Sequence, residues 1–364
     1  MSTNKYDILT VLGTRPEIIK LAPVIRSIED SNKLSGYIVH TGQHYDDELS
    51  GTFFRTLQLP DPDEQLHVGS GTQGEQTAGA LKKIEKVVAE RSPDVVIALG
   101  DTNAVLSAAL ATSKMEPQFG HIEAGIRSFD RSMPEEVNRV LADQVSDFAF
   151  APTETAADNL DNERVVGETC VVGNTVVDAC FEHTPIAEKE SSILNELELT
   201  KGEYTTATIH RPRNTDNIDR LTRIIEALDA QDFLVVFPSH PRTRNKVKTA
   251  DITYNGSLSL IDSLDYLDFL KLLNNSRVVV TDSGGVQEEA SILEVPCLTV
   301  RPNTERPETI EAGVNELIEP SAVHGRLKTV YQEPDIRESM TGHPNLYGDG
   351  NSAESIVSIL ENEL

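Results

Sequence analysis

The chain has 364 residues, 38% of them hydrophobic, which is long enough for about two domains with sizeable cores. No stretch approaches the ~20 apolar residues of a membrane span, and the N-terminal segment lacks the long apolar region of a signal peptide, so we expect a cytoplasmic protein without a membrane partner. The formal net charge of -27, from 59 acidic and 32 basic residues, argues against nucleic-acid binding, which requires basic residues to neutralise phosphates.

The spread of this charge and the few cysteines support two further expectations. Acidic residues dispersed along the whole chain are typical of adaptation to high salt, where ions screen self-repulsion, so we expect a halophilic protein. Cys170, Cys180 and Cys297 show no CxxC spacing, which predicts buried free thiols and neither a disulfide framework nor a metal site.

Short β-rich apolar runs alternate with helical patterns from one end of the chain to the other. In the first half the strand-like runs are 7–12, 37–42, 94–100 and 118–125, and helical stretches follow them, including one near 46–57. In the second half the runs are 205–210, 233–239, 258–262, 277–283 and 296–300. Continuous apolar strands between helices predict buried parallel sheets with right-handed crossovers.

A polar, weakly patterned stretch at 183–204 separates the two halves. We expect one domain over 1–172 and a second over 173–350, with the last helix, 351–364, packing back on the first. The predicted fold class is α/β, with two Rossmann-like doubly wound domains facing each other across a cleft. Ligands bind such sheets beyond the carboxyl ends of the strands, which is where the motifs below fall.

Ser283, Gly284 and Gly285 join a predicted strand to a predicted helix. Adjacent glycines let the backbone approach a ligand, and a helix start offers unpaired N–H groups and a positive dipole end, so the run predicts a phosphate site. Glu288 or Glu289 in the following turn is suited to accept hydrogen bonds from ribose hydroxyls. Taken alone, the motif is equally consistent with a tight structural turn that has acidic capping residues.

Basic residues gather at the predicted strand ends of this strongly acidic chain. They are Arg15, Lys20, His210, Arg211, Arg213, His240, Arg242, Arg244, Arg301 and Arg306. Local positive charge is what a diphosphate requires, although surface ion pairs account for several of these residues.

Three carboxylates also follow predicted strands or open helices: Asp101, Glu123 and Glu135. Helix capping explains Asp101 and Glu135 adequately but Glu123 poorly, since no helix start is evident beside it. Several carboxylates around one cleft can hold different protonation states, as acid–base chemistry needs. Asp143 and Asp147 resemble surface or helix residues, and we assign them no role.

These motifs together resemble the non-hydrolysing UDP-N-acetylglucosamine 2-epimerase family over nearly the whole chain. In family order they are GTRPEIIKLAP (13–23), TGQH (41–44), GDTNA (100–104), HIEAGIRS (121–128), PEEVNR (134–139), VGNTVVDA (172–179), HR (210–211), LDYLDF (264–269), TDSGGVQEEA (281–290) and RPNTERPETIEAG (301–313). The resemblance implies a GT-B-like fold, a homodimer, a UDP-sugar substrate used in polysaccharide biosynthesis, and no metal or other cofactor.

Matching positions imply a role for each candidate residue. The residues implied to hold UDP are Arg15, His210, Ser283, Gly284, Gly285 and Glu289, with Phe269 near the uracil. Asp101, Glu123 and Glu135 match the catalytic carboxylates, and His210 joins them as a catalytic group that stabilises departing UDP. Lys20 and Arg306 match further active-site positions.

The family inverts C2 of UDP-N-acetylglucosamine to give UDP-N-acetylmannosamine by elimination and re-addition of UDP. We favour Asp101 as the principal base, with Glu123 or Glu135 as its counterpart. Pro212 and Arg213 depart from the family's His-Arg-x-Glu-Asn pattern, so allosteric activation by a second substrate molecule is not implied. The alternatives are an epimerase of a UDP-2,3-diacetamido uronic acid sugar, a GT-B glycosyltransferase, a hydrolysing epimerase and a non-catalytic UDP-sugar sensor.

Overall fold

The structure, a computed structural model, describes residues 5–42, 54 and 57–364, and it divides into two compact units. Unit 1 consists of Met1–Ala179 and Tyr347–Leu364, and unit 2 of Cys180–Leu346. The helix expected near 46–57 and the last two residues of TGQH lie outside the described residues, apart from residues 54 and 57.

The division falls inside helix α7 (Thr175–Glu190), later in the chain than the boundary expected at 172/173. The two halves of α7 contact different partners. Asp178 accepts a hydrogen bond from the backbone N–H of Ala353 in unit 1 at 2.9 Å. His183 packs edge-on against Tyr266 of unit 2, with 5.7 Å between ring centroids. A continuous helical pattern carries no signal of this change of partner, which is why the sequence does not locate the division.

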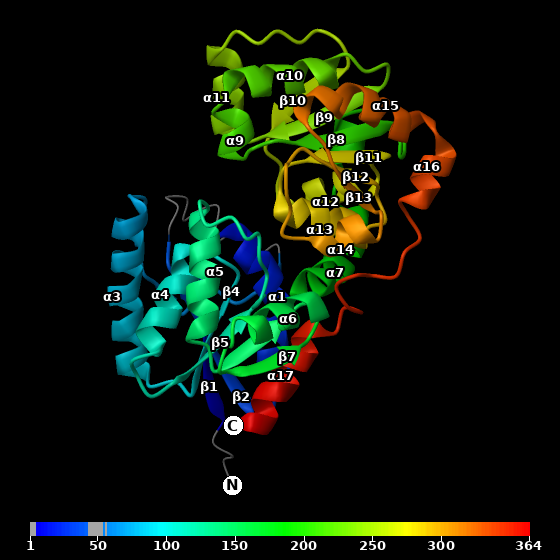
Figure 1. Ribbon diagram of the computed structural model, residues 1–364. Helices are drawn as coiled ribbons and strands as arrows, with labels where there is room; N and C mark the ends of the chain where they lie inside the picture. The colour runs from blue at the N-terminus through cyan, green and yellow to red at the C-terminus, as the bar shows by residue number, and fades with distance from the viewer. Residues whose placement is uncertain (1–4, 43–53, 55–56) are drawn as a thin grey trace. The chain divides into compact units, whose positions relative to one another are not determined.

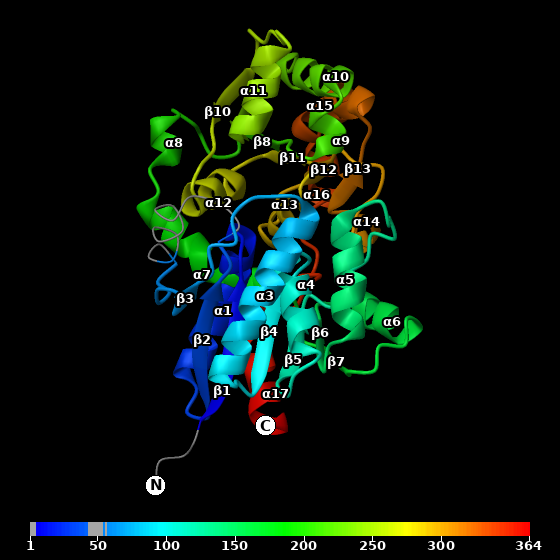
Figure 2. The same ribbon diagram turned by 90° about the vertical axis from the view of Figure 1, so that its left-hand side faces the viewer.

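In the described part of unit 1 (Figure 1) a parallel sheet has the strand order β3-β2-β1-β4-β5-β6-β7, with all seven strands labelled in Figure 2. Its strands are β1 (Tyr6–Leu12), β2 (Leu34–His40), β3 (Glu64–Gln65), β4 (Val95–Leu99), β5 (Gln118–Ile122), β6 (Phe148–Ala151) and β7 (Glu168–Val171). The order reverses at β1 and β4, and doubly wound sheets bind ligands beyond the carboxyl ends of the strands at such a reversal.

Helices cover both faces of this sheet, as expected for buried parallel strands. They are α1 (Arg15–Asp30), α3 (Gln73–Arg91), α4 (Asn103–Thr112), α5 (Pro134–Gln144), α6 (Glu154–Asn162) and α17 (Ser352–Glu363). Apolar residues of α3, α4 and α5 form one core with strand residues such as Leu9 and Phe119. Helix α17 packs beside α1 (Figure 2), where the Ser31 hydroxyl donates to Glu361 at 2.6 Å.

Unit 2 repeats the arrangement with a parallel sheet of order β10-β9-β8-β11-β12-β13. Its strands are β8 (Tyr204–Thr208), β9 (Leu234–Ser239), β10 (Leu258–Asp262), β11 (Val278–Thr281), β12 (Cys297–Thr299) and β13 (Asn315–Leu317). The reversal lies at β8 and β11, so both sheets have the doubly wound topology that was predicted.

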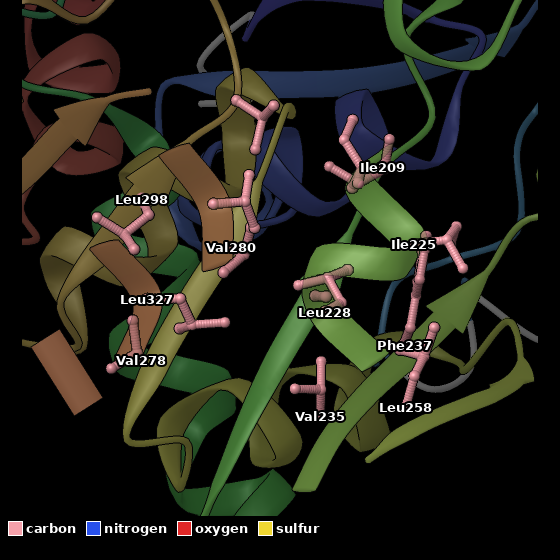
Figure 3. Packing of buried hydrophobic residues seen from close by; sticks show 14 of the residues in the cluster. Ile209, Ile225, Leu228, Val235, Phe237, Leu258, Val278, Val280, Leu298 and Leu327 are labelled. Atoms are coloured by element: carbon pink, nitrogen blue, oxygen red, sulfur yellow. The ribbon is translucent and has the colours of Figure 1, made fainter. Parts of the chain in front are cut away.

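The larger core of unit 2 packs helices α10 and α15 against the strands (Figure 3). Ile225 and Leu228 of α10 and Leu327 of α15 lie against Val280 and Phe237. The helices of this unit are α8 (Ile193–Glu196), α9 (Pro212–Thr215), α10 (Ile218–Asp229), α11 (Pro241–Thr249), α12 (Tyr266–Asn274), α13 (Gly284–Ile292), α14 (Pro307–Glu311), the 3-10 helix η1 (Pro320–Ala322), α15 (Val323–Gln332) and α16 (Pro334–Ser339).

The three cysteines are free thiols; Cys180 and Cys297 are buried, whereas Cys170 is only half-buried at an edge strand. Among the described helices, none is both long and apolar enough to cross a membrane.

Candidate active site

The β1–α1 turn of unit 1 is closed by the side chain of Glu17. Its carboxylate accepts hydrogen bonds from the backbone N–H groups of Gly13 (2.7 Å) and Thr14 (2.6 Å). The Thr102 hydroxyl donates to the other oxygen at 2.6 Å, which ties this turn to the β4–α4 turn. Burial raises the pKa of Glu17 to about 7, although hydrogen bonds from Thr102, Gly13 and Thr14 act to lower it. Arg15, the first residue of α1, is exposed beside this turn.

Asp101 lies in the β4–α4 turn, directly after Gly100 and before the helix cap Thr102. Its part-exposed carboxylate pairs with Arg139 of α5, and its carbonyl accepts from the Asn138 side chain at 2.9 Å. The structure therefore does not use the Asp101 side chain as the cap of α4, which was one explanation for an acid at this position. Its carboxylate is held at the strand reversal by a cation.

Glu123 follows β5 and has a backbone φ of 68°, in the left-handed region that non-glycine residues rarely adopt. Its largely buried carboxylate pairs with the ammonium of Lys20 at 2.5 Å. A Cβ placed on Gly100 would lie 3.6 Å from Glu123 Oε2, so this carboxylate reaches the residue that precedes Asp101. Unit 1 thus brings Lys20, Asp101 and Glu123 together at its strand reversal.

Asp143 was expected to be a surface or helix residue; it lies in helix α5, but its side chain is fully buried. It pairs with His121 at 2.5 Å and with Arg127 at 2.6 Å, and it accepts from the backbone N–H of Gly125 at 3.1 Å. Burial alone raises the pKa of the Asp143 carboxyl, but the two cations outweigh it and hold the pKa below its usual value. These contacts surround the backbone of Glu123.

Glu135 and Glu136 adopt different environments at the start of α5. Glu135 is exposed. Glu136 is buried and accepts from the backbone N–H groups of Ser128 (2.9 Å) and Phe129 (2.8 Å) and from Arg139 (2.9 Å). Glu136 thus has a structural role in closing the loop before α5, whereas the carboxylate of Glu135 is accessible to a ligand.

In unit 2 the β11–α13 turn carries the Ser-Gly-Gly run. Ser283 is the N-cap of α13, and its hydroxyl accepts from the Val286 N–H at 3.5 Å. A Cβ on Gly285 would meet no heavy atom within 4 Å, and one on Gly284 would come no nearer than 3.8 Å to Arg211. The first N–H groups of a helix have no partner within the helix, so this open turn suits a phosphate.

His210 follows β8 on the other side of the strand reversal and is fixed by Asp282. The buried Asp282 carboxylate accepts from the backbone N–H groups of His210 and Arg211, both at 3.0 Å, and lies 3.2 Å from the His210 Nδ1. Partial burial lowers the pKa of His210, neighbouring cations lower it further, and Asp282 opposes both effects. The His210 side chain is about half exposed.

The loop before α14 carries three ion pairs, two of them buried. Arg306 pairs with Glu288, and Glu305 pairs with Arg301 at 2.6 Å and with Arg211 at 3.4 Å. Burial opposes the charge of Glu305, but the arginines outweigh it and hold its pKa far below the usual range. Arg306 therefore orders this loop through Glu288, which is fully buried and cannot contact a ribose in this arrangement.

Phe269 and Glu289 both lie close to the open turn. Phe269 of α12 packs against the cluster that contains Val286 and Ala290 of α13. Glu289 is half-buried on α13. Both residues are thus placed beside the helix whose start the glycines expose.

Sequence reasoning missed three carboxylates that organise these turns: Glu17, Asp143 and Asp282. A signal for Glu17 was available, because Thr14 and Glu17 form a capping box. Asp143 and Asp282 carry no such local signal, since their partners lie 16 to 22 residues away for Asp143 and 71 or 72 residues away for the backbone groups bound by Asp282.

Comparison with known proteins gives consistent matches along the chain. Residues 26–361 match the family model described as UDP-N-acetylglucosamine 2-epimerase. A UDP-N-acetylglucosamine 2-epimerase of Methanocaldococcus jannaschii is 44% identical, over 96% of this chain and 97% of that protein. The solved structure of the UDP-GlcNAc 2-epimerase of that organism in complex with UDP-GlcNAc and UDP matches with a TM-score of 0.87 and 43% identity, over 98% of this chain and 99% of that one. The UDP-2,3-diacetamido-2,3-dideoxy-D-glucuronate 2-epimerase of Pseudomonas aeruginosa is 40% identical, over 97% of this chain and 99% of that protein. The prediction of a GT-B-like α/β fold with Rossmann-like units is confirmed.

Proposed function

This chain belongs to the UDP-N-acetylglucosamine 2-epimerase family and is an isomerase; we propose that it inverts C2 of UDP-N-acetylglucosamine by eliminating and re-adding UDP. The product is UDP-N-acetylmannosamine. The observation that carries the proposal is that the Glu123 carboxylate, paired with Lys20, reaches Gly100, the residue directly before Asp101 at the strand reversal of unit 1.

The chemistry explains why carboxylates are needed. The C2 proton of the sugar is weakly acidic because no carbonyl activates it directly. A carboxylate takes this proton while the C1–O bond breaks, and UDP leaves with the electron pair to give a 2-acetamidoglucal. Re-addition of UDP at C1, with a proton delivered to the opposite face of C2, gives the epimer. Two acid–base groups with different protonation states are therefore required.

In this proposal the acid–base groups come from unit 1. Asp101 is the principal base, and Glu123 or Glu135 returns the proton. Lys20 holds Glu123 through its 2.5 Å ion pair.

The remaining candidates hold UDP. The open start of α13 at Ser283, Gly284 and Gly285 binds the diphosphate, and Arg15 and His210 stabilise the charge that develops as UDP departs. Glu289 serves the ribose and Phe269 the uracil. Arg306 acts by keeping its loop in place, since its ion pair with Glu288 is buried.

The proposed reaction is tested by proton NMR of the protein with UDP-N-acetylglucosamine alone, in D2O. We expect a mixture with UDP-N-acetylmannosamine and solvent deuterium at C2 of both sugars. Free N-acetylmannosamine and UDP would instead indicate a hydrolysing epimerase, and binding without exchange would indicate a sensor. A requirement for an acceptor would indicate a glycosyltransferase.

A second candidate substrate is a UDP-2,3-diacetamido uronic acid sugar. The identity with the Pseudomonas aeruginosa enzyme, 40%, is close to the 44% with the Methanocaldococcus jannaschii enzyme. Competition between the two UDP-sugars in one reaction measures the ratio of kcat/KM directly, and we expect UDP-N-acetylglucosamine to react faster.

We also propose that the protein works as a cytoplasmic homodimer in polysaccharide biosynthesis and at high salt. Its net charge of -27 supports the last point, since screening by salt relieves repulsion among dispersed carboxylates. The melting temperature should therefore rise by roughly 10 °C or more between dilute buffer and molar KCl. A melting temperature that is independent of salt would contradict adaptation to salt and leave the reaction untouched.

A further inference from the structure

A buried cluster of charged side chains lies next to the strand reversal of unit 1, and the proposed reaction does not use it directly. Its members are His121 of β5, Arg127, Asp143 of α5 and Glu163, and the first three are almost or completely buried. Arg127 donates to both oxygens of Glu163, at 2.8 and 2.7 Å, and pairs with Asp143. Buried charges are costly unless they are paired and hydrogen-bonded, and here each charge has a partner of the opposite sign.

The cluster holds the backbone on both sides of Glu123. Asp143 pairs with His121, two residues before Glu123, and accepts from the N–H of Gly125, two residues after it. Glu123 itself has a backbone φ of 68°. Such a conformation persists only where the surroundings determine it, and Asp143 supplies that restraint.

The same cluster reaches the turn that carries Asp101. His121 Nε2 lies 2.8 Å from the carbonyl oxygen of Gly100, the residue before Asp101. The backbone of Gly100 has a φ of 91°, a conformation that glycine adopts readily and that other residues rarely do. One histidine ring therefore connects Asp143 to the segments that carry both carboxylates.

These contacts fix the charge of His121. The Gly100 carbonyl can only accept a hydrogen bond, so Nε2 must carry a proton. Asp143 pairs with Arg127 and accepts from the N–H of Gly125, and these contacts favour its ionised form, which accepts a hydrogen bond from a protonated Nδ1. Burial lowers the pKa of His121, but Asp143 and the carbonyl outweigh it and leave the pKa above its ordinary value. With His121 charged, the four side chains carry two positive and two negative charges.

We infer that the buried ion pair of Asp143 and His121 is a positioning device that holds Asp101 and Glu123 in the geometry needed for proton transfer at C2. The inference rests on the proposed epimerase function. Neither residue touches the sugar, so their effect is on the chemical step. Misplacement of a catalytic group by about 1 Å can cost ~10²-fold in rate.

The test is the Asp143→Asn variant of the full chain, assayed by NMR with UDP-N-acetylglucosamine. We expect kcat and solvent exchange at C2 to fall together by about 10²-fold, while KM and the affinity for UDP change by less than about threefold. Asp147→Asn is the matched control, because Asp147 accepts from the Phe119 N–H at 2.7 Å at the opposite end of β5. It should keep kcat within about twofold.

His121→Gln is the second variant, which keeps a donor but removes the charge, and it carries the test if Asp143→Asn does not fold. Its kcat should fall similarly while UDP affinity is kept. Nitrogen-15 NMR of histidine-labelled wild type should show both His121 nitrogens still protonated at pH values above ~6.5, the pKa of free histidine. A neutral ring, or folded variants with normal kcat, would overturn the inference.

The wild-type assay separates this inference from the proposed function. If the wild type does not epimerise the UDP-sugar, the proposed function fails, and the inference fails with it. If the wild type is active and the variants lose kcat and UDP affinity equally, only the positioning role is wrong.

Discussion

In both units the strand order reverses next to the first strand, and in both a carboxylate connects the two turns at the reversal. The first turn follows the first strand of the unit, β1 or β8, and the second turn follows the other strand at the reversal, β4 or β11. In unit 1 Glu17 binds the N–H groups of Gly13 and Thr14 and reaches Thr102. In unit 2 Asp282 binds the N–H groups of His210 and Arg211. In each case the first turn, where a doubly wound fold commonly binds phosphate, is already filled by a carboxyl group of the protein itself.

The difference between the units lies in the second turn. In unit 2 it is Ser283, Gly284 and Gly285, with open space at Gly285 and Arg211 close by. In unit 1 it carries Asp101 beside Arg139, so the same place in the fold presents a carboxylate. The comparison teaches that topology places the two turns, whereas the residues of one short turn decide whether it is open and glycine-rich or presents a carboxylate.

The largest effect is expected from removing the charge of the second turn in unit 1. Asp101→Asn should reduce epimerisation by at least ~10²-fold, because the principal base is lost, while UDP binding should remain. NMR of product formation and calorimetry of UDP binding measure the two effects. Asp94→Asn at the other end of β4, where Asp94 accepts from the Asp7 N–H at 2.7 Å, is the control. Near-normal turnover in Asp101→Asn would remove Asp101 from its role.

A smaller effect, on the affinity for UDP, is expected from adding a side chain to the second turn of unit 2. Gly285→Ala adds a methyl group to space that is open in the protein, so it should not destabilise the fold and can stabilise helix α13 by up to ~1 kcal/mol. If that space receives a phosphate, UDP affinity should fall about tenfold or more.

Gly325→Ala is the matched control for this experiment. Gly325 lies within helix α15, and a Cβ there also meets no heavy atom within 4 Å. UDP affinity should be unchanged in this variant. Equal UDP affinities of the Gly285→Ala protein and the wild type would show that the open turn is not the diphosphate site.

The last effect is on stability and not on activity: the buried carboxyl group of Glu17 in unit 1 should make the stability depend on pH. The folded-state pKa of Glu17 is about 7, above its ordinary value of 4.5, so its stabilising contribution is complete below about pH 4.5 and is lost as the pH rises through about 7.

Between these pH values, wild type should lose stability relative to Glu17→Gln by at most about 3 kcal/mol. Urea unfolding of both proteins across this pH range measures the difference between their free energies of unfolding. The contributions of the other titrating groups largely cancel in that difference. A difference that is constant with pH would mean that Glu17 stays ionised throughout.

The sequence predicted the parts that depend on local pattern. Alternating apolar runs revealed both sheets, and the glycines of 284–285 marked the open turn. The environment of the acids was harder to predict. Exposed Glu135 and buried Glu136 are neighbours in the same helical turn, and Asp143 owes its burial to partners on β5 and the loop after it. Whether such an acid is buried depends on partners that are distant in the sequence, and hydrophobic periodicity carries no information about those partners.

Helix α17 makes unit 1 discontinuous in the chain, with consequences for synthesis on the ribosome. Its Ile356 and Leu360 are fully buried, and Glu361 receives the hydroxyl hydrogen bond of Ser31. All of unit 2 is synthesised before this helix, so the unit that begins first is completed last. A nascent chain therefore carries an uncovered apolar surface along α1 until its final helix emerges.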